Sequence, residues 1–293
     1  MRVAAIGEAM IELSMDGDTA QVGVAGDTLN TAIYLKRCAP DIAVDYVTCL
    51  GDDAFSDRIH SFIEGQGIGT EAIDRLKGQA PGLYAISTTA EGERSFAYWR
   101  SASAARHMFE TEDGYDFDLL NGYDLIYLSG ISVAILPHKA RLALLKWLEN
   151  SAVRLAYDSN YRPRLWEDQK TAQDITARFW ERADICLPSI DDEMELFDTS
   201  EATIESKFGS VQAQGALKRG ANGPMSVGSL VEQTYDAAKT VVDTTAAGDS
   251  FNGGYLAAKL SGAAQDIALM AGHKLAMKVV GYRGAIIPKA ALT

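Results

Sequence analysis

The feature that most constrains the fold is a repeated alternation of short apolar runs with helical patterns. Runs at 3–6, 46–50 and 125–128 are continuous and uncharged, as in strands buried on both faces, and each ends at a glycine or a polar turn. Helical patterns follow at 54–64 and 137–149, among others. Strands that alternate with helices predict a doubly wound, mostly parallel central sheet with helices on both faces.

The polar turns after the predicted strands are candidate ligand contacts, because ligands of such sheets bind beyond the carboxyl ends of the strands. These turns lie at Asn160, Ser189, Gly220 and Asp249. In the last, a strand-like pair at 241–242 leads through a small-residue turn into a predicted helix at 250–260. The first N–H groups of a helix bind anions, above all phosphate. Asp249 there is either a helix N-cap or a base, and the turn alone leaves both open.

A predicted hairpin interrupts the alternation. Strand candidates at 83–88 and 94–100 are joined by Glu91, Gly92 and Glu93, a hairpin signature. We expect one domain over 1–293, with segments at about 9–24 and 83–103 inserted as a small sheet. Two further local predictions are an N-cap at Asp27 or Thr28 and a second hairpin from 225–227 with 231–235.

Composition limits the partners. The net charge of −13 argues against nucleic acid or an anionic membrane as the main partner. No apolar run reaches the ~18 residues of a membrane span, and the first residues do not read as a signal peptide. Cys38, Cys49 and Cys186 lack metal-type spacing and indicate free thiols of a reducing compartment. We expect a cytoplasmic protein.

Four motifs in order along the chain resemble those of the ribokinase-like (PfkB) carbohydrate kinases. They are the D-T-x-G-A-G-D-like run 243–249, the glycine and asparagine motif 26–30, the D-x-N-x-R run from Asp158 to Arg162 and the K-x-G-x-x-G-like loop 217–223. Within the family, the runs 26–32, 98–100, 160–166 and 283–288 look like the kinases of 2-keto-3-deoxygluconate. The resemblance implies a ribokinase-like fold with the small sheet as a lid, through which a homodimer or higher oligomer forms.

The resemblance implies transfer of a phosphoryl group from ATP, with Mg2+, to the C6 hydroxyl of a sugar acid. Asp249 is then the general base, and the N–H groups of Ala246, Ala247, Gly248 and Asp249 hold the phosphoryl oxygens. Arginine pairs with carboxylates in a bidentate fork, which makes Arg100 and Arg162 the expected contacts of the acid. The implied substrate contacts are Gly26, Asp27, Asn30, Tyr84, Tyr98, Arg100, Arg162 and Asp249. The implied nucleotide contacts are Asn160, Ser189, Lys218, Gly220, Gly223, Ala246 and Gly248.

The sequence departs from the family motifs at two positions, and each departure leads to a separate prediction. Ala246 replaces a glycine, and since alanine rarely adopts positive φ we expect a negative φ there. Ser189 stands where the family has asparagine, so either Asp192 or Glu193 orders magnesium, through water.

Each site residue also has a purely structural interpretation. The arginines and Lys218 can be surface charges, and the tyrosines can be half-buried strand aromatics. The alternatives are a fructokinase or ribokinase and, from another class, a dehydrogenase or a non-catalytic nucleotide-binding regulator. The dehydrogenase lacks support, because no G-x-G-x-x-G follows the first strand.

Overall fold

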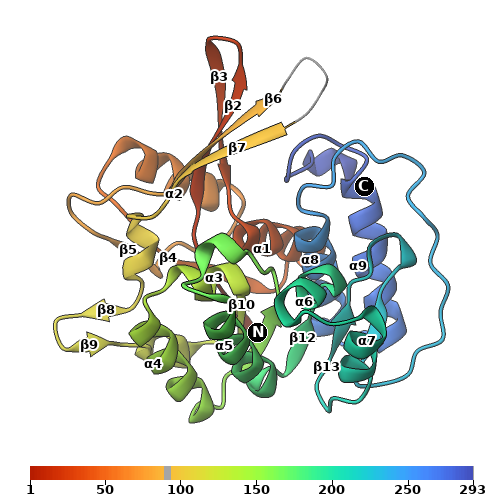
Figure 1. The fold of residues 1–293 in the computed structure, drawn as a ribbon. Helices are drawn as coiled ribbons and strands as arrows, with labels where there is room; N and C mark the ends of the chain where they lie inside the picture. The colour runs from red at the N-terminus through yellow and green to blue at the C-terminus, as the bar shows by residue number, and fades with distance from the viewer. Residues whose placement is uncertain (89–93, 293) are drawn as a thin grey trace.

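The computed structural model describes residues 1–88 and 94–292, so the predicted turn at 91–93 lies outside the described residues. Its centre is an eight-stranded sheet of order β14-β13-β12-β11-β10-β1-β4-β5 (Figure 1). Every neighbouring pair is parallel except β13 and β14. The predicted doubly wound, mostly parallel sheet is confirmed.

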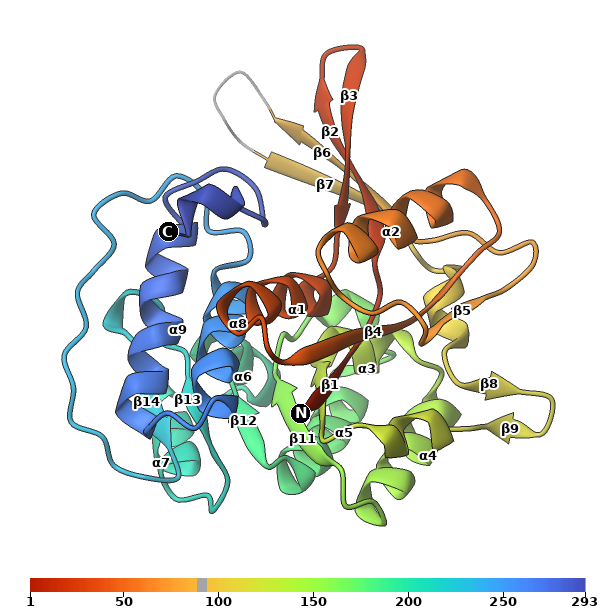
Figure 2. The ribbon, with the colours of Figure 1, turned by 180° about the vertical axis from the view of Figure 1, so that it is seen from behind.

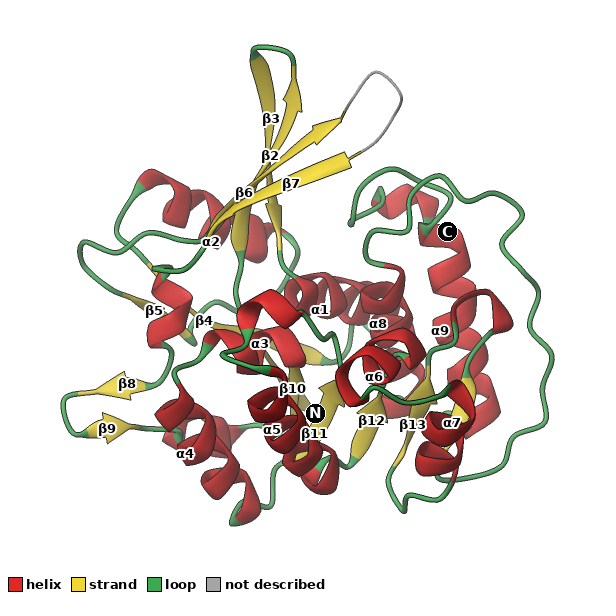
Figure 3. Ribbon diagram, in the orientation of Figure 1, coloured by secondary structure: helices red, strands yellow, loops and turns green. Residues whose placement is uncertain are grey.

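The bounds of the elements follow the predicted alternation closely (Figure 3). In chain order the strands of the large sheet are β1 (Arg2–Ile6), β4 (Ala43–Leu50), β5 (Ile73–Arg75), β10 (Leu125–Ser129), β11 (Arg154–Asp158), β12 (Ile185–Leu187), β13 (Gln214–Leu217) and β14 (Met225–Val227). The helices are α1 (Asp27–Cys38), α2 (Ala54–Gly65), α3 (Gly130–Ile135), α4 (His138–Glu149), α5 (Gln169–Arg182), α6 (Ile190–Phe197), α7 (Glu201–Gly209), α8 (Ala247–Leu260) and α9 (Gln265–Val279). A separate ribbon pairs β8 (Glu110–Thr111) with β9 (Gly114–Tyr115).

Two hydrophobic cores lie on the two faces of the large sheet, because successive side chains of a strand point to opposite faces. In β1, Val3 and Ala5 join the core under α1, α2, α8 and α9, whereas Ala4 and Ile6 join the core under α3 to α7. Figures 1 and 2 show these two helical layers in front of and behind the sheet. Cys49 and Cys186 are buried free thiols, whereas Cys38 is exposed.

A four-stranded small sheet stands on one edge of this body, as predicted. It comprises β2 (Met10–Asp16), β3 (Thr19–Ala25), β6 (Leu83–Thr88) and β7 (Arg94–Trp99), in the order β3-β2-β6-β7. Segments that lie more than 60 residues apart in the sequence therefore pair, as β2 does with β6. Figure 1 shows it rising above the helices at the top of the molecule.

Three local predictions are wrong. Met225–Val227 pairs with β13, and 231–235 forms no strand. Val241 and Val242 are also not a strand; they are 61% and 48% exposed. Short apolar runs carry too little periodicity to separate strand from loop. The N-cap of α1 is Gly26, which has no side chain to form a cap bond. A larger residue would not fit there, because a Cβ at Gly26 would overlap the carbonyl oxygen of Glu8.

Within the described ranges no helix is both long and apolar enough to cross a membrane.

Candidate active site

The predicted site residues gather at the carboxyl edge of the large sheet. Asp158 is the last residue of β11, Lys218 directly follows β13, and Ser189 lies between β12 and α6. The first turns of α1 and α8 meet at the same edge, where Asn30 contacts Asp249. Five segments from different parts of the sequence therefore form one polar cluster.

Asp249 lies in the first turn of α8 and is held by α1. Its Oδ2 accepts a hydrogen bond from Nδ2 of Asn30 at 2.8 Å, and its backbone oxygen accepts one from the Thr31 hydroxyl at 3.2 Å. Desolvation, followed by repulsion from Asp27 and Asp158, raises the pKa of Asp249 to about 8, although Asn30 and Lys218 oppose this. A carboxylate with a pKa near neutrality is poised to take a proton.

The turn before α8 presents backbone donors. The Ala247 N–H already bonds to the Thr244 oxygen at 3.1 Å, whereas those of Ala246, Gly248 and Asp249 find no backbone acceptor in the described part of the chain. The expectation of a negative φ at Ala246 is wrong: φ is 59° and ψ is 21°. The left-handed backbone of this N-cap starts the helix, since the Ser250 N–H bonds to the Ala246 oxygen at 2.9 Å.

Lys218 lies beside this turn within a polar network. Its Nζ is 2.6 Å from Oδ1 of Asp158 and 3.1 Å from Oδ1 of Asn252. Asn252 donates to the other Asp158 oxygen at 2.7 Å and to the Tyr127 hydroxyl at 3.0 Å. The Tyr127 hydroxyl is 3.1 Å from that of Thr31, which contacts Asp249. A Cβ added to Gly248 would lie 4.0 Å from Nζ, so the ammonium faces the start of α8.

The remaining nucleotide-side candidates form short turns around this network. Asn160 donates to Asp27 at 2.7 Å and has a positive φ of 29°. Gly220 and Gly223 have φ of 53° and 75°, and a Cβ at Gly223 would overlap the ring of Tyr235. Backbone strain at a non-glycine residue such as Asn160 is typical of functional sites.

The structure separates the two candidate metal carboxylates. Asp192 faces Ser159, whose hydroxyl is 3.2 Å away, and Arg162, whose Nη1 is 3.3 Å away. Glu193 is fully buried, and its oxygens accept from Trp180 at 3.0 Å and Lys207 at 3.1 Å. Among the described residues no three His, Cys, Asp or Glu cluster as a preformed metal site. Of these two carboxylates, Asp192 is the partly exposed one, and partial exposure suits a mostly hydrated magnesium ion.

Three of the sugar-side candidates, Tyr84, Tyr98 and Arg100, belong to the small sheet and its base, whereas Arg162 follows β11 of the large sheet. The Tyr84 hydroxyl donates to Glu12, and the Tyr84 ring stacks on Tyr98 with centroids 5.6 Å apart. Tyr98 itself is 50% exposed. Arg100 is no surface arginine, because its side chain is 10% exposed and forms an ion pair with the buried Glu8. Arg162, by contrast, is 53% exposed.

Sequence reasoning missed several polar residues of this cluster. Glu8, Glu12, Thr31 and Asn252 each contact a predicted site residue, and Tyr127 contacts Thr31 and Asn252. A charged residue beside a short apolar run is a signal of a functional or paired group, because burying an unpaired charge is costly. Glu8 and Glu12 flank the apolar residues 9–11 in this way. No comparable signal marks the other three.

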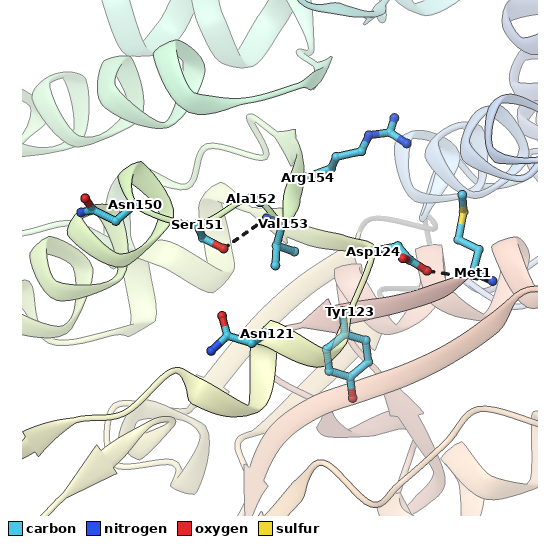
Figure 4. A pocket seen from close by; sticks show the side chains of 9 residues that line it. All are labelled: Met1, Asn121, Tyr123, Asp124, Asn150, Ser151, Ala152, Val153 and Arg154. Atoms are coloured by element: carbon cyan, nitrogen blue, oxygen red, sulfur yellow. Dashed lines mark hydrogen bonds and ion pairs between the residues drawn. The ribbon is translucent and has the colours of Figure 1, made fainter.

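A shallow pocket elsewhere on the surface lacks this chemistry (Figure 4). It lies at the amino ends of β1, β10 and β11, opposite the edge that carries Asp249. Its lining residues are Met1, Asn121, Tyr123, Asp124, Asn150, Ser151, Ala152, Val153 and Arg154. The polar cluster at the carboxyl edge is therefore the candidate active site.

Comparison with known proteins gives consistent matches over the full length. The family model described as pfkB family carbohydrate kinase matches residues 1–291. Proteins named 2-dehydro-3-deoxygluconokinase from Escherichia coli and Dickeya dadantii are 39% and 40% identical, over 99% of this chain and 98% of each of theirs. In fold, the chain is similar to a PfkB protein from a Polaromonas species, with a TM-score of 0.82 at 23% identity over 99% of this chain and 98% of that one.

Proposed function

Because the chain belongs to the pfkB family of carbohydrate kinases, we propose that it transfers the γ-phosphoryl group of ATP to the C6 hydroxyl of 2-keto-3-deoxygluconate. The product is 2-keto-3-deoxy-6-phosphogluconate, and the reaction class is phosphotransfer to an alcohol. The observation that carries the proposal is the identity of 39–40% to 2-dehydro-3-deoxygluconokinases over nearly the whole of both chains.

In this proposal Asp249 is the general base. The Asn30 amide fixes its carboxylate, and the raised pKa lets it take the proton of the acceptor hydroxyl as the new bond to phosphorus forms. The acceptor itself lies against Gly26, Asp27 and Asn30 at the start of α1. Positioning and electrostatic stabilisation are the main contributions that a protein makes to phosphoryl transfer, and the base accepts the acceptor's proton.

The donor side supplies positive charge and backbone donors. The N–H groups of Ala246, Gly248 and Asp249, at the positive end of α8, hold the transferring phosphoryl oxygens. Lys218 adds an ammonium beside them, fixed by Asp158. The nucleotide itself lies along the turns at Asn160, Ser189, Gly220 and Gly223, where the glycines allow close approach of its phosphates and ribose.

Asp192 is the residue we assign to magnesium, through water. Bound magnesium neutralises charge on the ATP phosphates, and one carboxylate with several waters is its usual arrangement in such sites. Glu193 is not chosen for this role, because its side chain is fully buried and pairs with Lys207 and Trp180.

The acid group of the acceptor distinguishes this reaction from that of a fructokinase or ribokinase. A carboxylate needs a cation, and Arg100 lies at the base of the small sheet with a buried Nε that has no hydrogen-bond partner in the described part of the chain. Arg162 supplies a second, more exposed guanidinium. A non-catalytic nucleotide-binding regulator would not need a base held as Asp249 is.

The small sheet is proposed to close as a lid and to meet a second copy of the chain. Tyr84 and Tyr98 then face the sugar, and closure excludes water that would hydrolyse ATP. Phe96, Tyr98 and Trp99 are 46%, 50% and 61% exposed, and exposed aromatics of this kind favour a protein interface. The protein is expected to act in the cytoplasm as a homodimer or higher oligomer.

The test is ADP release by the purified protein with ATP and Mg2+ across a panel of sugar acids and neutral sugars. We expect 2-keto-3-deoxygluconate to give the highest kcat/KM. A preference for fructose or ribose would replace the proposal by its alternatives, and no turnover with any sugar would favour the regulator.

A further inference from the structure

The base of the small sheet is organised around one buried carboxylate, Glu8. Four chain crossings connect the small sheet to the body, and one residue marks each of them. Glu8 precedes β2, Gly26 follows β3, Gly82 precedes β6 and Arg100 follows β7. Figures 1 and 2 show the four strands leaving the body together. We call these four residues the sheet base.

Glu8 contacts the other three residues of the sheet base. Its carboxylate pairs with the guanidinium of Arg100. A Cβ at Gly82 would overlap Oε1 of Glu8, and one at Gly26 would overlap the Glu8 backbone oxygen. The two glycines therefore allow the four crossings to pack closely around Glu8, so a single side chain lies at the centre of the sheet base.

The ion pair fixes the guanidinium. The Glu8 and Arg100 side chains are 1% and 10% exposed. A charge buried to this degree is tolerated only when it is paired, so each side chain restricts the orientation of the other. An arginine has five N–H donors; Nη2 of Arg100 forms the ion pair with Glu8, and within the described ranges neither Nη2 nor the buried Nε makes a further hydrogen bond. Arg100 is thus held in place with donor capacity to spare.

We propose that Glu8 is a positioning residue for the acceptor site, which holds Arg100 toward the acid group of the acceptor and ties that contact to the placement of the small sheet. The inference rests on the proposed function, in which Arg100 binds the acceptor carboxylate. Glu8 touches neither substrate in this proposal and acts through Arg100. Arginine orientation matters here because bidentate pairing with a carboxylate is strict in geometry.

The test is Glu8→Gln, which removes the charge and keeps the shape. We expect KM for 2-keto-3-deoxygluconate to rise about tenfold, while KM for ATP and kcat stay within about threefold. Glu167→Gln is the matched control, because Glu167 pairs with the buried Arg141 at 2.7 Å in the body of the molecule. In an Arg100→Ala background, Glu8→Gln should add no further rise in KM, since Glu8 acts through Arg100.

Three results would overturn the inference. A lower KM for the acid in Glu8→Gln would mean that Glu8 competes with the acceptor for Arg100. An unchanged KM, with or without a lower unfolding temperature, would mean a purely structural role. A full additional rise in the Arg100→Ala background would separate Glu8 from Arg100. If Glu8→Gln does not fold, Glu8→Asp, which keeps the charge but withdraws it by one methylene, should raise the same KM. Absence of acid-dependent turnover in the wild type would instead refute the proposed function.

Discussion

The two sides of the site differ in how firmly their side chains are held. On the phosphoryl side, Lys218, Asp158 and Asn252 bond to one another, and Asp249 is fixed by Asn30. On the acceptor side, Arg100 is fixed by Glu8, but Tyr98 is half-exposed, and the strands of the small sheet stand away from the body. Electrostatic stabilisation works best when its dipoles are fixed before the reaction. Contacts to the sugar can form when the small sheet closes, so the less constrained groups lie on that sheet.

The largest effect is expected on the firmly held side, from Asp249→Asn. The amide keeps the shape and can still pair with Asn30, but it cannot take the acceptor proton. Turnover measured by ADP release should fall about 10³- to 10⁴-fold, near the upper range for general-base catalysis, while ATP binding by calorimetry persists.

Asp266→Asn is the matched control, since Asp266 is an exposed first-turn acid of α9 and should leave kcat within about twofold. Near-wild-type turnover in Asp249→Asn would end the assignment of the base.

The pH dependence should report the same carboxylate. Asp249 must be ionised to act, and its pKa in the free protein is about 8. We expect kcat/KM for the acceptor to rise about tenfold per pH unit below that value, roughly 100-fold over two units, and then to level off. A profile already flat from about pH 6 would contradict a raised pKa.

The free energy of unfolding should change with pH in the direction opposite to kcat/KM. Between the ordinary value of 3.8 and about 8, the folded protein holds a proton at Asp249 that the unfolded chain releases. The contribution of this group to the free energy of unfolding is therefore largest at low pH and is lost as the pH rises toward 8. Urea unfolding of wild type and Asp249→Asn, compared across this window, measures that difference.

A smaller and more selective effect is expected on the acceptor side, from Arg100→Ala. Loss of a charge-assisted contact worth about 2 kcal/mol should raise KM for the sugar acid about thirtyfold and leave KM for ATP within about threefold. The buried Glu8 then lacks its cation and is expected to take up a proton. Arg178→Ala, at an exposed ion pair with Glu149, is the control. Equal changes in both KM values would argue against a carboxylate contact.

The features of the fold that depend on local sequence pattern can be predicted from the sequence. Alternating apolar runs and helices were sufficient for the large sheet, and the hairpin signature for the small one. The contacts of Glu8 and Asn252 were missed because they join segments 92 and 34 or more residues apart, which only the topology brings together. Local rules alone do not specify such pairs.

Ala246 shows why a sound local rule failed. The Asp243 carboxylate accepts from the Thr245 N–H at 3.0 Å and from the Gly284 N–H at 2.9 Å, so the turn is tied at both ends. α8 begins directly afterwards, and its first intrahelical bond requires the Ala246 oxygen to point along the helix. These tertiary ties override the preference of alanine for negative φ, and the cost is stored at the phosphoryl side of the site.

The smallest expected effect tests that stored strain through Ala246→Gly. A left-handed alanine costs about 1 kcal/mol, and glycine removes this cost but adds freedom to the unfolded chain, so the net gain in the free energy of unfolding should be at most about 1 kcal/mol. The neighbouring Ala247 is the first residue of α8, and Ala247→Gly should instead lose up to about 0.5 kcal/mol. A gain in the free energy of unfolding for Ala246→Gly and a loss for Ala247→Gly, both measured by urea unfolding, would identify Ala246 as a strained position on the phosphoryl side of the site. An equal loss in both variants would mean that its backbone carries no such cost.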